Sequence, residues 1–196
     1  MIRVAIEAKL FGKQQILGPI GFEIAPGETV ALVGRSGIGK STLLNIVAGI
    51  DTSFLGSVER PETMAIVFQE PTLLPWRSAL GNLLLPNAGL EKERALAALD
   101  RIGLAGKDSV FPGQLSLGQQ RRLALARAFV GRPELLLMDE PFVSLDPDIA
   151  DSMMALTEEL IAETRPATLF VTHSRSEAKR LSDRVLTLSG SPASLG

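Results

Sequence analysis

The sequence predicts an α/β fold with a mostly parallel core sheet. Short, nearly continuous apolar runs occur at residues 29–33, 135–138 and 168–172, which is the pattern of strands buried on both faces of a parallel sheet. Between the last two runs, apolar residues at steps of four, three and four from Ile149 to Leu160 indicate an amphipathic helix. Strands that alternate with helices are typical of a parallel sheet.

The N-terminal part is expected to form an antiparallel β subdomain. Apolar and polar residues alternate at 2–7 and again at 20–24, which indicates strands of a partly exposed sheet. Helices are expected at 41–48, at 147 onward after Asp146 as N-cap, and after a capping box formed by Ser174 and Glu177.

An inserted α-helical subdomain is expected at about residues 70–130, within a single domain that spans 1–196. A strand-like run at 64–68 precedes it, the chain is proline-rich and irregular from Pro71 to Pro86, and a helical stretch follows at 91–102. The small, polar residues 189–196 predict a frayed tail.

The amino-acid composition excludes several classes of protein. With 45% hydrophobic and 21% charged residues the chain can bury a core, which excludes disorder and collagen-like fibres. The net charge is −2 and the sequence contains no long run of basic residues, so we expect no nucleic-acid partner. There is no cysteine, secretory signal or apolar run near the roughly 20 residues that span a bilayer, so a reducing, cytosolic setting is expected.

A glycine-rich loop at 34–41 matches G-x-x-x-x-G-K-[ST] between a predicted buried strand and a predicted helix. Such a loop turns its backbone N–H groups toward phosphate oxygens, and the helix N-terminus adds partial positive charge. Lys40 would reach the β- and γ-phosphates, and Ser41 could coordinate Mg²⁺. The residues expected to bind nucleotide here are Gly34, Arg35, Ser36, Gly37, Ile38, Gly39, Lys40, Ser41 and Thr42.

Two carboxylates, Asp139 and Glu140, directly follow the apolar run at 135–138. Parallel sheets place ligand-binding groups at the C-terminal ends of their strands. We therefore expect Asp139 to help hold Mg²⁺, and Glu140 to take a proton from water that attacks the γ-phosphate. The fold is then that of a P-loop NTPase.

Residues 115–128, which begin Leu-Ser-Leu-Gly-Gln, resemble the signature of ATP-binding-cassette (ABC) ATPases. The similarity covers almost the whole chain, because Phe11, the phosphate loop, Gln69, this signature, Asp139 with Glu140, residues 144–146 and His173 occur in the family's order. A small P-loop kinase or GTPase gives no reason for residues 115–119.

The resemblance implies that ATP lies between two copies of the chain. Ser116 and Gly118, with Gln119, would contact ATP bound to the second copy, and Asp146 belongs to a loop that crosses the dimer interface. Leu117 stands where the family usually has glycine, and Val143 replaces a usual small residue. Without the other motifs, residues 116–119 would favour the start of an ordinary N-capped amphipathic helix.

Three further residues acquire roles through the resemblance. Gln69 would touch Mg²⁺ and the attacking water, although it could simply cap a strand. His173, the chain's only histidine, matches a catalytic switch residue that senses the γ-phosphate, whereas a lone histidine is more often structural. Phe11 would stack on adenine, or alternatively belong to the core beside Leu10.

The segment Leu73 to Arg77 resembles the nitrate, sulfonate and taurine importer branch, where this surface meets a membrane permease. Trp76 would anchor that contact, unless it lies in the core of the helical lobe. The implied protein is the ATPase of an ABC transporter, peripheral on the cytoplasmic face of the inner membrane, working with a permease and an extracytoplasmic substrate-binding protein. The alternative is a cassette ATPase that acts on nucleic acid or ribosomes.

Overall fold

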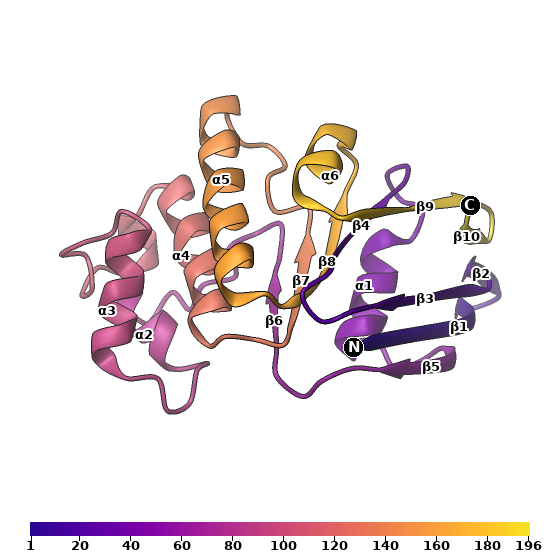
Figure 1. Ribbon diagram of the computed structural model, residues 1–196, viewed down its shortest axis with the longest axis horizontal. Coiled ribbons are helices and arrows are strands. Elements are labelled where there is room, and N and C mark those ends of the chain that lie inside the picture. The colour runs from indigo at the N-terminus through magenta and orange to yellow at the C-terminus, as the bar shows by residue number, and fades with distance from the viewer. The chain divides into compact units, whose positions relative to one another are not determined.

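The computed structural model describes all 196 residues, Met1–Gly196, as two compact units (Figure 1). The first, here called the sheet unit, comprises Met1–Ile66, Glu134–Glu140 and Arg165–Gly196. The second, the helical unit, comprises Val67–Pro133 and Pro141–Thr164. None of the helices has the length and apolar composition needed to cross a membrane.

One ten-stranded sheet runs in the order β3-β1-β2-β10-β9-β4-β8-β7-β6, with β5 paired to β1. β4 pairs in parallel with both β8 and β9, and β7 pairs in parallel with β8, whereas β1 pairs antiparallel with β2, β3 and β5. This confirms the predicted α/β fold with a mostly parallel core. The strands are β1 Ile2–Phe11, β2 Gln14–Leu17, β3 Ile20–Ile24, β4 Thr29–Val33, β5 Leu55–Glu59, β6 Met64–Val67, β7 Leu135–Asp139, β8 Ala167–Thr172, β9 Arg184–Gly190 and β10 Ala193–Leu195.

Burial follows the sequence pattern strand by strand. β8 is buried at all six positions, and β4 and β7 are buried at all but the last, because neighbours cover them on both faces. β3 alternates between buried and exposed residues, as expected for a sheet with one solvated face. The last residues of β4 and β7 are only half-buried, and this is where the polar residues of the site begin.

Two helices belong to the sheet unit, α1 Lys40–Ala48 and α6 Arg175–Leu181. Gly49 ends α1 in the left-handed conformation, with φ 73°. Ser174 caps α6 as predicted, accepting a hydrogen bond from the Glu177 N–H at 3.3 Å. The predicted reciprocal box does not form, because the Glu177 carboxylate instead accepts a 2.6 Å hydrogen bond from the hydroxyl of Thr172.

The prediction of a frayed tail is wrong. β9 continues to Gly190, and β10 then pairs antiparallel with β9 and in parallel with β2. Ala193 is only 2% exposed, and its carbonyl accepts a 2.7 Å hydrogen bond from the Gly18 N–H. Small residues let β10 fit between two strands, and sequence polarity alone does not reveal such edge pairing.

The helical unit contains α2 Ala79–Leu84, α3 Lys92–Arg101, the 3₁₀ turn Pro112–Gln114, α4 Leu117–Val130 and α5 Pro147–Thr164. Its core brings together apolar residues of α2, α3 and α4, among them Leu83, Leu99 and Leu123. α2 lies where the prolines predict irregular chain. Ser78 caps it, and the fully buried amide of Asn82 ties it to the backbone of Leu74 and Arg77.

Candidate functional site

The glycine-rich loop joins the end of β4 to α1 and depends on its glycines. Gly37 and Gly39 adopt φ values of 75° and 109°, which favour glycine. A Cβ at Gly39 would lie 2.7 Å from Leu17 Cδ2, so no larger residue fits without a shift in the packing. No side chain caps α1, and the N–H groups of its first turn are left for an external acceptor.

Lys40 is 4% exposed, and its ammonium group is held inside the loop. The Nζ atom donates to the carbonyls of Gly34 at 3.1 Å and Arg35 at 3.2 Å, and lies 3.4 Å from Glu140 Oε1. A buried ammonium needs such partners, because burying an unpaired charge is costly. The loop therefore places a single cation against its own backbone, within reach of a bound anion.

Ser41 and Asp139 meet although 98 positions separate them in the sequence. The Ser41 hydroxyl donates to Asp139 Oδ1 at 3.1 Å. Burial raises the pKa of Asp139, and the hydrogen bond from Ser41 opposes that rise. A hydroxyl and a carboxylate are the hard oxygen donors that suit Mg²⁺, and this pair fits that ion. No group of three or more His, Asp or Glu could enclose a metal, so the remaining ligands would come from water and substrate oxygens.

Glu140 lies between a cation and a histidine. Its Oε2 atom is 3.0 Å from His173 Nδ1, and Oε1 faces the Lys40 ammonium. The sheet produces this meeting, because Asp139 pairs with Val171 on the adjacent strand β8 and the Glu140 N–H donates to the Val171 carbonyl at 2.9 Å. Glu140 also adopts φ 46°, a left-handed conformation that non-glycine residues rarely adopt and that is common at functional sites.

Phe11 ends β1 with 55% of its surface exposed, so the alternative of a core phenylalanine is wrong. The ammonium of Lys9 lies 4.6 Å from the ring centroid. That ammonium is almost buried and is fixed by Asp51 at 2.6 Å and by the Ser53 carbonyl at 2.8 Å. One face of the ring therefore rests on a fixed cation, while much of the side chain stays open to solvent.

In the helical unit, Ser116 caps α4 through a full capping box. Its hydroxyl accepts from the Gln119 N–H at 3.3 Å, and Gln119 Oε1 accepts from the Ser116 N–H at 3.1 Å. A Cβ on Gly118 would lie 3.6 Å from Ile149 Cγ2, which is ordinary contact. Leu117 is exposed beside Ser116.

The loop between β7 and α5 is fastened by a buried arginine. Arg121 donates to the Val143 carbonyl at 2.8 Å, and Ser144 adopts φ 57°. Asp146 caps α5 as expected, since its Oδ1 atom accepts from the Asp148 N–H at 3.1 Å. Asp146 and Ser116 therefore both mark helix starts in the helical unit.

The segment after Gln69 is held by Arg127, a residue that the sequence does not single out. Arg127 donates to the carbonyls of Thr72 at 2.9 Å and Pro71 at 3.2 Å, and burial lowers its pKa. Thr72 adopts φ 46°, so the arginine fastens a strained turn. The available signal was a lone arginine between the buried residues Ala126 and Ala128 of α4.

Trp76 is 67% exposed, so the alternative that places it in the core of the lobe is wrong. Leu85 and Phe111 of the same unit are exposed as well. The Ala79 N–H donates to the Val110 carbonyl at 2.8 Å, which brings the chain around Phe111 to the start of α2. The helical unit thus exposes large apolar side chains at several positions.

The sheet unit brings together the glycine-rich loop, Lys40, Ser41, Asp139, Glu140 and His173. Gln69, Ser116, Gly118, Gln119 and Asp146 belong to the helical unit. The first set combines an anion cradle, a cation, two oxygen donors for a metal ion and a carboxylate bonded to an imidazole. These are the parts that phosphoryl transfer to water requires.

Comparison with known proteins places this arrangement in a family. A family model described as ABC transporter matches residues 17–143. The chain is 47% identical over 193 residues to the aliphatic sulfonates import ATP-binding protein SsuB of Mycobacterium sp. (strain MCS), covering 95% of this chain and 79% of that protein. It is 46% identical to SsuB 3 of Nocardia farcinica, covering 95% and 76%.

A solved structure shows the same fold around nucleotide. The ATP-binding cassette MJ0796, in a dimeric post-hydrolysis state bound to ADP and Pi, has a TM-score of 0.83 and 29% identity to this chain, covering 100% of this chain and 96% of the other. Together with the family match and the relatives near half identity over almost the full chain, this likeness decides the classification. The chain belongs to the ABC transporter family and is an ATP-binding, ATP-hydrolysing subunit of that family.

Proposed function

We propose that this ATPase subunit powers the import of a small anion, an aliphatic sulfonate foremost, through a separate membrane permease. The observation that carries the ATPase part is the meeting of Lys40, Ser41, Asp139 and Glu140 around the glycine-rich loop. Relatives named as aliphatic sulfonate import proteins match over nearly the whole chain, and they favour transport over action on nucleic acid or ribosomes.

ATP binding begins at the loop between β4 and α1. The N–H groups of residues 34–42 surround the phosphates, and Lys40 turns from the carbonyls of Gly34 and Arg35 toward phosphate oxygens. The same movement separates Lys40 from Glu140, which now lie 3.4 Å apart. Nucleotide binding therefore frees the carboxylate that the next step needs. Phe11 offers its exposed ring to adenine, because stacking requires only a flat π-face.

Ser41 and Asp139 would hold Mg²⁺, which when bound would neutralise phosphate charge. Glu140 acts as the general base. Its carboxylate accepts a proton from the attacking water, while the Oε2 contact with His173 at 3.0 Å orients it. His173 also stands ready to donate a hydrogen bond to the γ-phosphate. The work of this site is positioning and electrostatics, because the water itself is the nucleophile.

The site is completed by a second copy of the chain. Solved dimeric cassettes of the same fold support pairing. Ser116 and Gly118, with Gln119, lie at the N-terminus of α4, where the helix dipole favours an anion, and they contact the γ-phosphate of ATP held by the partner copy. Asp146 begins α5 at the same interface. Leu117 is exposed there and is bulkier than the glycine usual in the family at this position.

Trp76 and its neighbours contact the permease on the cytoplasmic face of the inner membrane, and an extracytoplasmic binding protein delivers the cargo. The support is the exposure of Trp76, since large aromatic residues are the usual anchors of protein interfaces.

Growth on single sulfur sources tests the proposal. A strain that lacks this protein should fail to grow on hexane-1-sulfonate, and the wild-type chain, but not Glu140→Gln, should restore growth. Growth on sulfate is the control and should not change. Normal growth of the deletion strain on hexane-1-sulfonate, with failure on taurine or nitrate instead, would assign a different cargo. Co-purification of wild type and Trp76→Ala from membranes tests the permease contact, and equal recovery would contradict it.

A further inference from the structure

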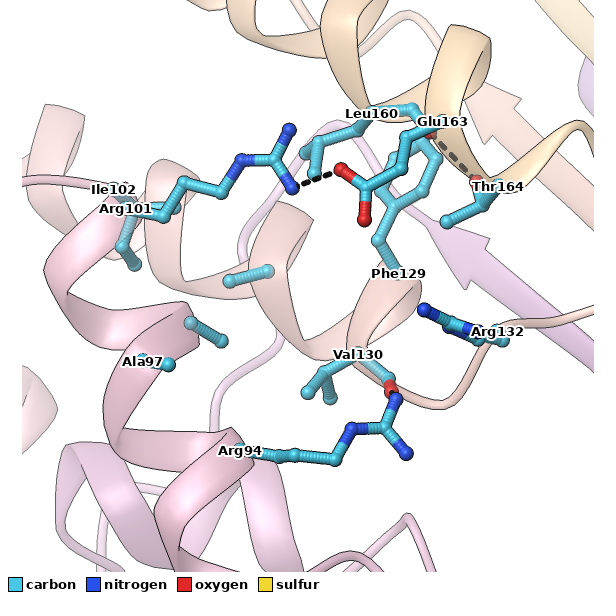
Figure 2. Close-up of a pocket in the computed structure, with 12 residues that line it drawn as sticks. Arg94, Ala97, Arg101, Ile102, Phe129, Val130, Arg132, Leu160, Glu163 and Thr164 are labelled. Atoms are coloured by element: carbon cyan, nitrogen blue, oxygen red, sulfur yellow. Dashed lines mark hydrogen bonds and ion pairs between the residues drawn. The ribbon is translucent and has the colours of Figure 1, made fainter.

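The helical unit contains a cavity of about 220 Å³ outside the nucleotide site (Figure 2). It lies where α3, the end of α4 and the last turns of α5 face one another, and Figure 2 shows side chains of all three helices around it. The phosphate loop and its partner residues do not take part. The cavity therefore needs an explanation separate from ATP hydrolysis.

The floor of the cavity is apolar because α3 and α4 present small residues to it. Ala97, Ala98 and Ala126 leave space that larger side chains would fill. Phe129 and Leu160, both nearly buried, close the base. An apolar hollow of this kind is poorly suited to water, since a buried water needs two to four polar partners.

The rim of the cavity is cationic. Arg94, Arg101 and Arg132 line it together with one carboxylate, that of Glu163 (Figure 2). Arg101 is already neutralised, because it pairs with Glu163 and with Glu159. Arg94 donates a single 3.3 Å hydrogen bond to the Val130 carbonyl, and the Arg132 side chain has no partner. Two guanidinium groups therefore retain free donors beside an apolar floor.

We propose that this cavity binds a short amphipathic anion, an aliphatic chain of about four to six carbons with a sulfonate or carboxylate head. The chain would lie on the alanines, Phe129 and Leu160, and the head would bridge Arg94 and Arg132, whose planar forks match both head groups. At roughly 30 Å³ for a water-sized group, 220 Å³ holds about seven such groups, which sets the chain length.

A ligand of this class could come from two sources. It could be an alkanesulfonate brought in by the transporter, or an intracellular carboxylate. The first arm rests on the proposed cargo, and it would make the cavity a sensor of imported product. The binding site itself does not depend on the cargo, because it is argued only from residues of the helical unit. Binding is therefore measured on the purified subunit, apart from any transport assay.

The test is titration calorimetry with hexane-1-sulfonate and, separately, hexanoate, in the presence of a saturating non-hydrolysable ATP analogue that blocks the phosphate loop. A ligand of about ten heavy atoms should bind with a Kd between about 1 μM and 1 mM. Hexan-1-ol and methanesulfonate, which lack the head and the chain respectively, should bind at least tenfold more weakly. The tighter of the two anions identifies the source.

Variants locate the binding. The double change Arg94→Gln with Arg132→Gln should weaken binding at least tenfold, and Ala97→Leu should abolish it by filling the floor. Lys92→Gln is the matched control, because it removes a cation from the same helix away from the cavity, and it should bind as wild type. All these positions are exposed, so folding should persist, as circular dichroism would verify. No heat of binding for wild type at 10 mM ligand, or equal affinity in the cavity variants, would overturn the proposal.

Discussion

Glu140→Gln should separate ATP binding from ATP hydrolysis. Glutamine keeps the size of the side chain and can still accept a hydrogen bond from His173, which lies 3.0 Å from Glu140 Oε2. It loses the capacity to take a proton from water. General bases contribute about 10²–10⁴ to a rate, so we expect kcat to fall by that factor, which corresponds to roughly 3–5 kcal/mol in activation free energy.

The same substitution should strengthen ATP binding. Glu140 lies 3.4 Å from the Lys40 ammonium, and we expect it to compete with phosphate for that cation. The pair is partly solvated on the Glu140 side, so an interaction of at most about 1 kcal/mol is reasonable. Its removal should lower the Kd for ATP up to about fivefold. Binding and turnover therefore move in opposite directions.

Two assays check both halves of this prediction: phosphate release under saturating MgATP, and equilibrium binding of a fluorescent ATP analogue. Glu134→Gln is the control, because it makes the same change at the other end of β7, where Glu134 accepts a hydrogen bond from Thr63. That variant should behave as wild type. Hydrolysis by Glu140→Gln within a few-fold of wild type would remove Glu140 from its role, and weaker ATP binding would refute the competition with Lys40.

The remaining predictions concern stability and adenine binding. Burial raises the pKa of Asp139, so the carboxylate lowers the free energy of unfolding as the pH rises through that raised pKa. Asp139→Asn should raise the free energy of unfolding by about 0.5–2 kcal/mol at pH 7, and it should abolish hydrolysis. In urea titrations this gain in stability should shrink toward pH ~4. Arg127→Met should lower the free energy of unfolding by about 1–3 kcal/mol, because the Thr72 carbonyl loses its hydrogen-bond donor. An unchanged midpoint of urea unfolding would contradict this prediction. Phe11→Ala should weaken ATP binding about 5- to 100-fold, as removal of a base-stacking ring does, and Phe11→Trp should not. Lys9→Met should reproduce part of that loss.

Local sequence patterns predicted the features that contiguous residues determine. The glycine-rich loop needs its glycines, lysine and serine in one run, and the buried strands β4, β7 and β8 are recognised by short apolar runs. The place of Asp139 and Glu140 at the end of β7 also follows such a run, whereas their chemical roles stay predictions. The exposed positions of Phe11 and Trp76 were not predictable, because an isolated aromatic residue has the same local pattern in a core or on a surface.

Features that depend on residues distant in the sequence could not be predicted from local sequence patterns. β10 exists because Ala193 fits between β9 and β2, and its own residues carry no strand signal. Glu177 was expected to complete a capping box, but the hydroxyl of Thr172 is nearer and takes its carboxylate. Arg127 is identified as a positioning residue only by its hydrogen bond to the Thr72 carbonyl, which is distant in the sequence. In each case a tertiary contact outweighed a local preference.

Two features that lower the stability of this fold lie at residues of the proposed catalytic site. At the end of β7, Asp139 has a raised pKa from burial and Glu140 adopts a left-handed backbone conformation, and each feature lowers stability. The hydrogen bonds between β7 and β8 extend to Glu140, whose N–H donates to the Val171 carbonyl at 2.9 Å. In the proposed mechanism a bound metal ion would offset the charge of Asp139, and the backbone conformation of Glu140 would direct its carboxylate toward the attacking water. Substrate binding would then restore stability that these two residues reduce.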